Sequence, residues 1–330
     1  MSSLGSFSFH GYQGPTGYLL PQPVLEKHTA IDLNESVLVA MSSMQGWRQT
    51  MEDVSVVLLR IPGDHTETMY FSVFDGHGGS RVAKYAGTNL HKHIMKQREW
   101  EHNIKEAIYK GYKECDAYMR MDKQIMNEMS GTTALTIYIR DNHIVCANVG
   151  DSRAVGCAAG RVVRLSYDHK PSLPTERSRI LAAGGFVEAD RVNGNLALSR
   201  ALGDFQYKIP NFSPEFQMVS PVPDIILKPL DRNWEFVVIA CDGIWEVMTN
   251  EMVVQFVRSR LIDRIPLQNI AEALITSCLS PKCTGMSVGC DNMSVIIIQF
   301  RWNRSDTGAA RQPTPQNLQH VKTKTRKPIK

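Results

Sequence analysis

Short runs rich in Val, Ile and aromatic residues recur along the chain, and they predict β-strands in both halves of the sequence. Polar segments with turn residues separate these runs. The predicted strands are Ser36–Met41, Asp53–Arg60, Tyr70–Phe74, Thr133–Ile139, His143–Val149, Ala154–Cys157, Val162–Leu165, Phe236–Ala240 and Ser294–Phe300.

Helical stretches interrupt the strand runs, and two pairs of them are consecutive. The regular alternation of strand and helix in a doubly wound parallel sheet is therefore not indicated. The pattern predicts the α+β class, with layers of mostly antiparallel sheet covered by helices. The predicted helices are Ser80–Lys96, Asn103–Met121, Thr175–Ala182, Asn250–Leu261 and Leu267–Leu279.

Composition divides the 330 residues into three parts. Residues 1–23 are rich in Gly, Ser, Pro and aromatic residues without a sustained period, and they predict a flexible lead-in. Residues 24–301 contain no linker of that composition and predict one domain. Residues 302–330 predict a disordered tail, and from Arg301 onward eight Lys and Arg residues stand against one acid. Such a tail can contact nucleic acid, anionic lipid or an import receptor, or simply be solvated.

Three apolar strand segments adjoin an aspartate. The first two end at Asp75 and Asp242, and the third begins just after Asp291. A carboxylate at the end of a buried strand is costly to desolvate unless a positive charge meets it. Converging acids also repel one another, and a hard divalent cation relieves both costs. The three aspartates therefore predict a metal-ion centre.

These segments allow two other interpretations. Asp-Gly is a strong hairpin signal, so Asp75-Gly76 and Asp242-Gly243 could form tight turns, although neither is clearly followed by a strand. The glycines after Asp75 do not have the spacing of a dinucleotide loop, because Arg81 stands where its third glycine would fall. No P-loop motif occurs either, so kinases and dinucleotide enzymes are disfavoured.

Further charged residues lie near these segments in the sequence. Arg48 precedes Glu52 and Asp53 by four and five residues, and Asp151 follows another predicted strand. Alone, this is an ordinary surface charge pattern. Beside a metal centre, the arginine can bind two phosphate oxygens, and the acids can hold water on the metal ions.

The seven cysteines form no Cys-x-x-Cys pair. Their odd number, without a secretory signal sequence, predicts reduced thiols and a cytoplasmic or nuclear protein. Cys283 and Cys290 share a loop, where we read them as loop thiols and not as zinc ligands. No apolar run reaches the roughly 20 residues that a membrane-spanning helix needs.

Eight motifs, in order and across about residues 24–300, resemble the metal-dependent protein phosphatases of the type 2C (PPM) family. These motifs are Met44–Asp53, Phe74–Gly79, Ser130–Ala134, Val149–Ala154, Asp168–Ser172, Arg191–Asp204, Ala240–Trp245 and Asp291–Ser294. The resemblance implies a sandwich of two antiparallel β-sheets flanked by pairs of α-helices. It also implies hydrolysis of phosphoserine and phosphothreonine in proteins by water that two Mg²⁺ or Mn²⁺ ions activate.

The resemblance further implies a role for each site residue. Asp75 bridges the two ions, and the Gly76 carbonyl is a ligand of one of them. Asp242 and Asp291 bind the other ion. Glu52 and Asp53 act largely through water on the metals, Arg48 binds the phosphate, and His77 is the general acid. These roles agree with the physical chemistry, because an alkoxide is a poor leaving group and imidazole can donate a proton near neutral pH.

The sequence departs from the family pattern at two places. Glu246 stands where many members have Asp, and that acid with Asp151 is implied to hold a weaker third ion. The Met-Gly start and the helical C-terminal extension of some animal relatives are not evident. The alternative is a catalytically inactive phosphatase-like scaffold or regulatory binding protein, although such proteins normally lose metal acids. We expect a monomer that acts on phosphoproteins and does not bind nucleic acid.

Overall fold

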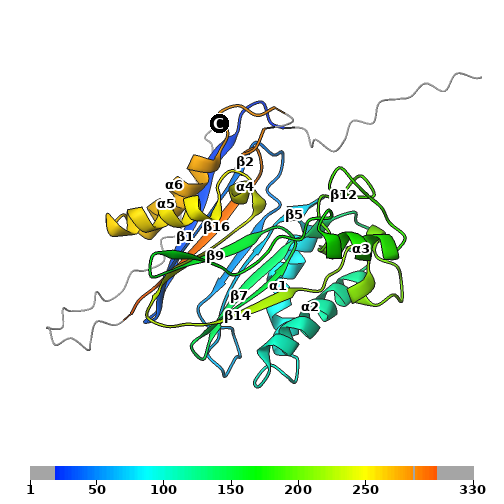
Figure 1. Cartoon of the computed structure of the whole chain (residues 1–330), viewed down its shortest axis with the longest axis horizontal. Helices are drawn as coiled ribbons and strands as arrows, with labels where there is room; N and C mark the ends of the chain where they lie inside the picture. Colours follow the sequence, from blue (N-terminus) through cyan, green and yellow to red (C-terminus); the bar gives the residue numbers. More distant parts are fainter. Residues whose placement is uncertain (1–18, 285–286, 303–330) are drawn as a thin grey trace, which may run out of the picture.

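The computed structural model describes residues 19–284 and 287–302. Two antiparallel β-sheets stack face to face, and a pair of helices covers the outer face of each sheet (Figure 1). Residues 1–18 of the predicted lead-in and 303–330 of the predicted tail lie outside the described residues. The first strand begins at Val24 and the last ends at Phe300.

The larger sheet has six strands in the order β1-β2-β16-β15-β9-β10, and every neighbouring pair is antiparallel. Its strands are β1 (Val24–Leu33), β2 (Val37–Gly46), β16 (Met293–Phe300), β15 (Trp234–Ala240), β9 (Arg153–Ala158) and β10 (Arg161–Arg164).

The second sheet has five strands in the order β14-β8-β7-β4-β3, again all antiparallel. Its strands are β14 (Asp224–Pro229), β8 (His143–Val149), β7 (Ala134–Arg140), β4 (Met69–Phe74) and β3 (Val54–Leu58). Two small sheets accompany the sandwich, made of β13 (Leu202–Gly203), β6 (Gly131–Thr132) and β5 (Gly76–His77), and of β11 (Val187–Glu188) and β12 (Arg191–Val192).

Six α-helices occur in the described residues, and two of them, α2 and α5, begin with a side-chain N-cap. The Asn103 side chain accepts a hydrogen bond from the backbone of Glu106, and the Thr249 hydroxyl accepts one from Met252. The helices are α1 (Arg81–Met95), α2 (Ile104–Met121), α3 (Pro174–Ala182), α4 (Asp242–Trp245), α5 (Asn250–Ile262) and α6 (Leu267–Cys278). None of them is both long enough and apolar enough to cross a bilayer.

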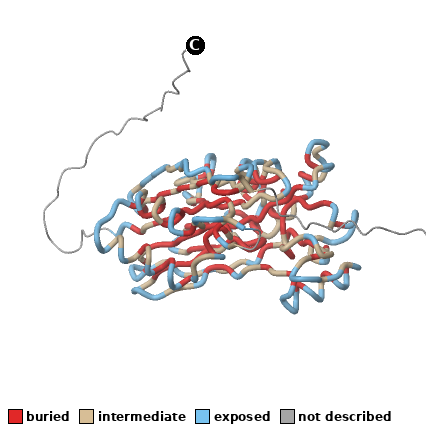
Figure 2. Tube along the Cα trace, turned by 90° about the horizontal axis from the view of Figure 1, so that it is seen from above, coloured by how far each residue is buried: buried red, intermediate tan, exposed pale blue. Residues whose placement is uncertain are grey.

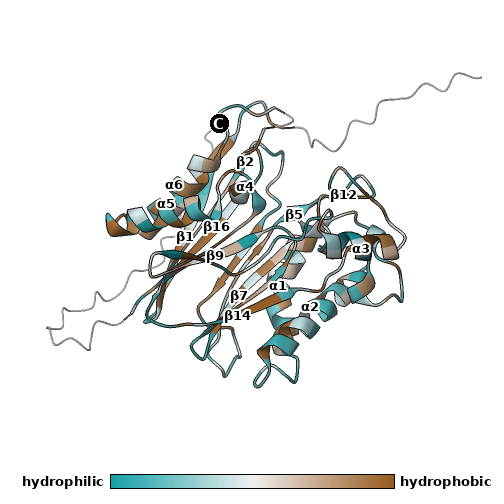
Figure 3. Cartoon of the chain, in the orientation of Figure 1, coloured by the Kyte–Doolittle hydropathy of each residue, from teal (hydrophilic) through white to brown (hydrophobic). Residues whose placement is uncertain are grey.

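The two sheets and the helices on their outer faces form four layers, and three apolar clusters join these layers. One lies between the two sheets, a second joins the five-stranded sheet to α1 and α2, and a third joins the six-stranded sheet to α4, α5 and α6. Buried residues accordingly fill the middle of the molecule in Figure 2, and exposed ones line its rim. In Figure 3 the hydrophobic colour is concentrated in the central strands, whereas α2 is largely hydrophilic.

Strand β16 illustrates why the central strands are apolar at nearly every position. Val295 and Ile297 belong to the cluster under the helices, whereas Ile296 and Ile298 belong to the cluster between the sheets. Successive side chains point to opposite faces of a strand, so a strand with both faces buried needs apolar residues on both.

The predicted α+β class, with antiparallel sheets covered by helices, is confirmed. Every predicted strand and helix has a counterpart whose ends differ by a few residues. Not every observed element was predicted: the two-residue strands β5, β6, β11, β12 and β13 are missing from the prediction, and so are β1, β14 and α4. Strand β1 is mostly exposed and contains charged residues, β14 is a partly exposed edge strand, and α4 is a single turn. These elements lack the buried apolar periodicity on which the prediction rests.

Candidate metal centre

Antiparallel pairing gathers the predicted acids at one end of the sandwich. Phe74 pairs with Val54, so Asp75 after β4 lies beside Asp53 before β3. In the other sheet, Ala240 at the end of β15 pairs with residues at the starts of both β16 and β9. Asp242 is thereby brought close to the segments that carry Asp291 and Asp151.

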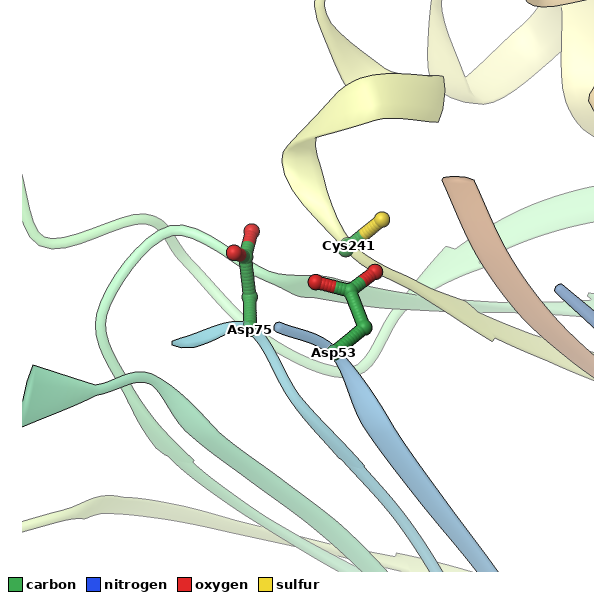
Figure 4. A group of neighbouring side chains, drawn as sticks. All are labelled: Asp53, Asp75 and Cys241. Atoms are coloured by element: carbon green, nitrogen blue, oxygen red, sulfur yellow. The ribbon is translucent and has the colours of Figure 1, made fainter. Parts of the chain in front are cut away.

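The carboxylates form two overlapping groups. Ligand atoms of Asp75, Asp151 and Asp242 lie within 4.8 Å of one another, and so do those of Asp53, Asp75 and the thiol of Cys241. Figure 4 shows the Asp53 and Asp75 carboxyl groups pointing to the same side, near the Cys241 sulfur. Asp75 belongs to both groups, which is the position that a bridging ligand requires.

Burial and mutual repulsion make these acids hard to ionise. Desolvation raises the pKa of Asp53 to about 6, and the nearby Asp291 carboxylate adds to the effect. The pKa values of Asp75 and Asp242 lie well above the ordinary range, first because both are buried and then because of neighbouring carboxylates. Desolvation also raises the pKa of Glu246. A positive charge in this centre would stabilise the ionised carboxylates and so lower each of these raised pKa values.

The residues present fit a hard divalent cation. Among the described residues, the two carboxylate oxygens of Asp53 are buried and have no hydrogen-bond partner. The donors in the centre are mainly carboxylate oxygens, which Mg²⁺ and Mn²⁺ prefer. Two cationic side chains reach these acids, since Lys170 contacts Asp151 and Arg48 contacts Asp291. Neither side chain forms an ion pair with Asp53, Asp75 or Asp242 within the described part of the chain.

Asp291 belongs to neither of the two overlapping groups of residues, and it lies beside them. One of its oxygens accepts a hydrogen bond from the Arg48 guanidinium, and the other accepts one from the backbone of Asn292. The predicted phosphate-binding arginine and the predicted metal ligand are therefore in direct contact. The Arg48 side chain is 43% exposed, which leaves part of its guanidinium open to a ligand.

Glu52 and Gly76 are held by short-range contacts beside the acids. The Glu52 carboxylate accepts hydrogen bonds from the Thr50 hydroxyl and from the Gly79 backbone N–H. A Cβ atom on Gly76 would lie 2.6 Å from the Glu52 carbonyl oxygen, so only glycine lets these two backbones approach.

His77 lies next to Gly76 in β5, and its Nε2 atom is 2.7 Å from a carboxylate oxygen of Asp204. Burial lowers the pKa of His77, but the carboxylates of Asp204, Asp151 and Glu52 outweigh it, so the pKa is raised above its ordinary value. The carboxylates around His77 therefore favour its protonated form, the imidazolium, which has a proton to transfer.

Three supporting residues were not assigned roles from the sequence, although each lies in a motif that the sequence analysis identified. Lys170 neutralises part of the charge on Asp151. The Asn292 side chain donates to the carbonyls of Gln45 and Thr50 and accepts from the Glu52 N–H, which ties the Arg48 segment to β16. The Thr133 hydroxyl accepts a hydrogen bond from the Asp75 N–H at 3.0 Å. Their motif positions were the only available signal.

The tight-turn interpretation of the Asp-Gly pairs is wrong. Gly76 enters a short strand that pairs with β6, not with β4, and Asp242 begins helix α4. A hairpin needs the following residues to pair back onto the same strand, and neither segment does so.

The prediction that all cysteines are free thiols is wrong for two of them. Cys283 and Cys290 form a disulfide with Cα atoms 5.9 Å apart, whereas the other five are free and buried. The Ser280 N–H donates to the Gly289 carbonyl and closes the loop, which brings the two cysteines together. No local sequence pattern indicates that closure. Cys290 directly precedes Asp291.

The four-layer fold and the buried carboxylates at one end of its sandwich define a metal-dependent enzyme. The family model described as "Protein phosphatase 2C" matches residues 37–286. The chain therefore belongs to the protein phosphatase 2C family, and it is a metal-dependent protein serine/threonine phosphatase.

Individual comparisons agree with this placement. The chain is 50% identical over 284 residues to a Caenorhabditis elegans protein named "Probable protein phosphatase 2C", and the match covers 86% of this chain and 80% of that protein. It is 41% identical over 294 residues to "Protein phosphatase 2C homolog 2" of Schizosaccharomyces pombe, covering 87% and 80%. A Toxoplasma gondii phosphatase structure superposes with a TM-score of 0.70 at 27% identity, covering 83% and 96%.

Proposed function

We propose that the acidic centre holds two Mg²⁺ or Mn²⁺ ions and uses them to hydrolyse phosphoserine and phosphothreonine in proteins. The observation that carries this proposal is the pair of overlapping carboxylate groups that share Asp75. Bound there, the ions would supply the positive charge that activates water and stabilises the phosphoryl group in the transition state.

The proposed ligand set keeps the roles that the family resemblance implies for these acids. Asp75 would bridge the two ions, with the Gly76 carbonyl on one side and Asp242 with Asp291 on the other. Glu52 and Asp53 would contribute indirectly, as hydrogen-bond acceptors beside the ions. Asp151 and Glu246 would hold a weaker third ion, because both carboxyl groups act electrostatically on Asp242.

Two side chains would act on the substrate. The Arg48 guanidinium would bind two phosphate oxygens, in exchange for part of its contact with Asp291. His77 would donate a proton to the serine or threonine oxygen as the phosphorus–oxygen bond breaks. This division of labour is the one expected of an active enzyme, and no observation favours the inactive scaffold.

The proposal is tested with a phosphothreonine peptide under three conditions. We expect release of phosphate by the wild-type protein with Mn²⁺, and its loss both with a chelator and in Asp242→Ala with Mn²⁺. Asp32→Ala provides a matched control, because Asp32 is an exposed aspartate on the edge strand β1. Equal activity in the wild-type, chelated and Asp242→Ala samples would overturn the proposal.

A further inference from the structure

The imidazole that we assign as the proton donor is tied to a deeply buried carboxylate. His77 Nε2 lies 2.7 Å from Asp204 Oδ2. The Asp204 side chain is 1% exposed and the His77 side chain 28% exposed. The contact therefore occupies the inner edge of the ring, and Nδ1 is the ring nitrogen that Asp204 does not engage.

The fold keeps a space open for this contact. In the three-stranded sheet, Gly131 of β6 pairs with His77 on one side and with Gly203, which precedes Asp204, on the other. A Cβ atom on Gly131 would lie 2.1 Å from Asp204 Oδ2 and 2.6 Å from His77 Nε2. The hydrogen bond thus crosses the place where any other residue would put its side chain.

Asp204 itself is fixed by its surroundings. Its N–H donates to the Ser130 carbonyl at 3.0 Å, and it has a left-handed backbone with φ of 50°. The preceding residue, Gly203, donates its N–H to the buried Asp116 carboxylate, which also binds Lys208 at 2.6 Å. Because the backbone around Asp204 is held in this way, the Asp204 carboxylate cannot easily follow a moving imidazole. The His77 ring must therefore adopt the orientation that Asp204 imposes.

We propose that Asp204 is a positioning residue that holds His77 in the orientation needed to protonate the leaving group. This inference rests on the proposed role of His77. With Nε2–H donated to Asp204, the transferable proton lies on Nδ1. A water oxygen forms a new bond to phosphorus, and the electron pair of the breaking ester bond passes to the serine or threonine oxygen. That oxygen takes the Nδ1 proton, so the His77 imidazolium becomes a neutral imidazole whose Nε2–H is still donated to Asp204, and the protons of the water leave with the released phosphate.

Leaving-group chemistry separates positioning from a purely structural role. The alkoxide of serine or threonine needs a proton, whereas p-nitrophenolate leaves without one. In Asp204→Asn we expect kcat on a phosphothreonine peptide to fall about a hundredfold with KM little changed, the size of a typical general-acid effect. We expect kcat on p-nitrophenyl phosphate to fall less than about threefold on the same reasoning, because no proton donor is required.

A double-mutant cycle tests whether Asp204 acts through His77. His77→Asn alone should show the same selective loss on the peptide. Adding Asp204→Asn to it should cause no further loss, because residues that act as a unit are not additive. Asp64→Asn is the matched control, since Asp64 is also a buried carboxylate and accepts hydrogen bonds from Trp100 and Thr68. It should affect both substrates equally.

The outcomes separate this inference from the proposed function. Equal losses on both substrates in Asp204→Asn, together with a selective loss in His77→Asn, would overturn the inference alone. No selectivity in His77→Asn would overturn the inference and the proposed role of His77 together. Retained activity on p-nitrophenyl phosphate shows that a variant is folded. If Asp204→Asn does not fold, Gly131→Ala displaces the contact without removing either group, and the same selective loss is expected.

Discussion

Two groups of buried acids in this molecule have opposite surroundings. At the metal centre, Asp53, Asp75 and Asp242 face other carboxylates, and their pKa values are raised. In α3, Glu176 is also buried, and burial alone would raise its pKa. Hydrogen bonds and charge from Arg200 and Arg179 outweigh that effect and lower the pKa to about 2.

The difference shows how a functional acid is distinguished from a structural one. Burial is common to both groups, so burial does not identify the site. What differs is whether the chain itself supplies the compensating charge. Glu176 has its cations in the fold, whereas we propose that the acids at the end of the sandwich take theirs from solution. Four predictions test this contrast.

The largest effect is expected for Asp75→Asn. This change removes the carboxylate that belongs to both overlapping sets of ligands in the metal centre, the one with Asp53 and the one with Asp242. In the proposed mechanism catalysis depends on the positive charge that this residue helps to hold, so we expect phosphatase activity with Mn²⁺ to fall at least about a hundredfold. Steady-state hydrolysis of a phosphothreonine peptide measures it, with Asp32→Asn as the exposed control. Activity within tenfold of wild type would contradict the role given to Asp75.

The two groups should respond oppositely in stability when an acid is made neutral. Glu176→Gln leaves the largely buried Arg179 without its charge partner and leaves Arg200 with Asp224 alone, so the free energy of unfolding should fall by about 3–5 kcal/mol. Asp242→Asn removes repulsion, so the metal-free protein should not be destabilised. Denaturant unfolding in chelator compares the two variants with wild type. A loss of similar size in both would remove the distinction between the groups.

The pH dependence of metal-free stability should also have opposite signs. A carboxyl group with a raised pKa binds more protons in the folded state than in the unfolded state, so stability falls as pH rises toward the folded value. For Asp53 this window runs from its ordinary pKa of 3.8 to about 6. Glu176 instead stabilises the fold above its ordinary value, and that contribution is lost as pH falls toward 2.

The Asp53 contribution is isolated by comparing wild type with Asp53→Asn in chelator across this range. The stability of wild type relative to the variant should decline between about pH 4 and 6 and level off above about pH 7. A flat difference, or a rise with pH, would show that the Asp53 pKa is not raised in the folded protein.

The smallest effect is expected at Glu246, which stands at the edge of the acidic centre. Replacing it with the shorter aspartate should change the affinity for a third ion without abolishing the two-metal centre. We expect Glu246→Asp to remain active and to show a shifted Mn²⁺ dependence of turnover, within about tenfold in metal concentration. An unchanged metal profile would contradict a role for Glu246 in holding the third ion.

The sequence contained enough information for the sandwich and for most acids of the centre. Central strands with both faces buried must be apolar throughout, and the acids stand out at their ends. Edge strands β1 and β14 are partly solvated, so their composition resembles that of loops. Local patterns could not reveal contacts between distant segments. The His77–Asp204 pair joins residues 127 positions apart, and it depends on a glycine in a third segment.

The acids of the metal centre come from both halves of the sandwich. Asp53 and Asp75 extend strands of the five-stranded sheet, whereas Asp242 and Asp291 adjoin strands of the six-stranded sheet. A cation held among them would have ligands from both sheets and would therefore link one sheet to the other. Free metal at a hundred times the dissociation constant would add about 2.7 kcal/mol to the folded state. The supply of divalent ions in a cell would then govern the lifetime of the protein as well as its turnover.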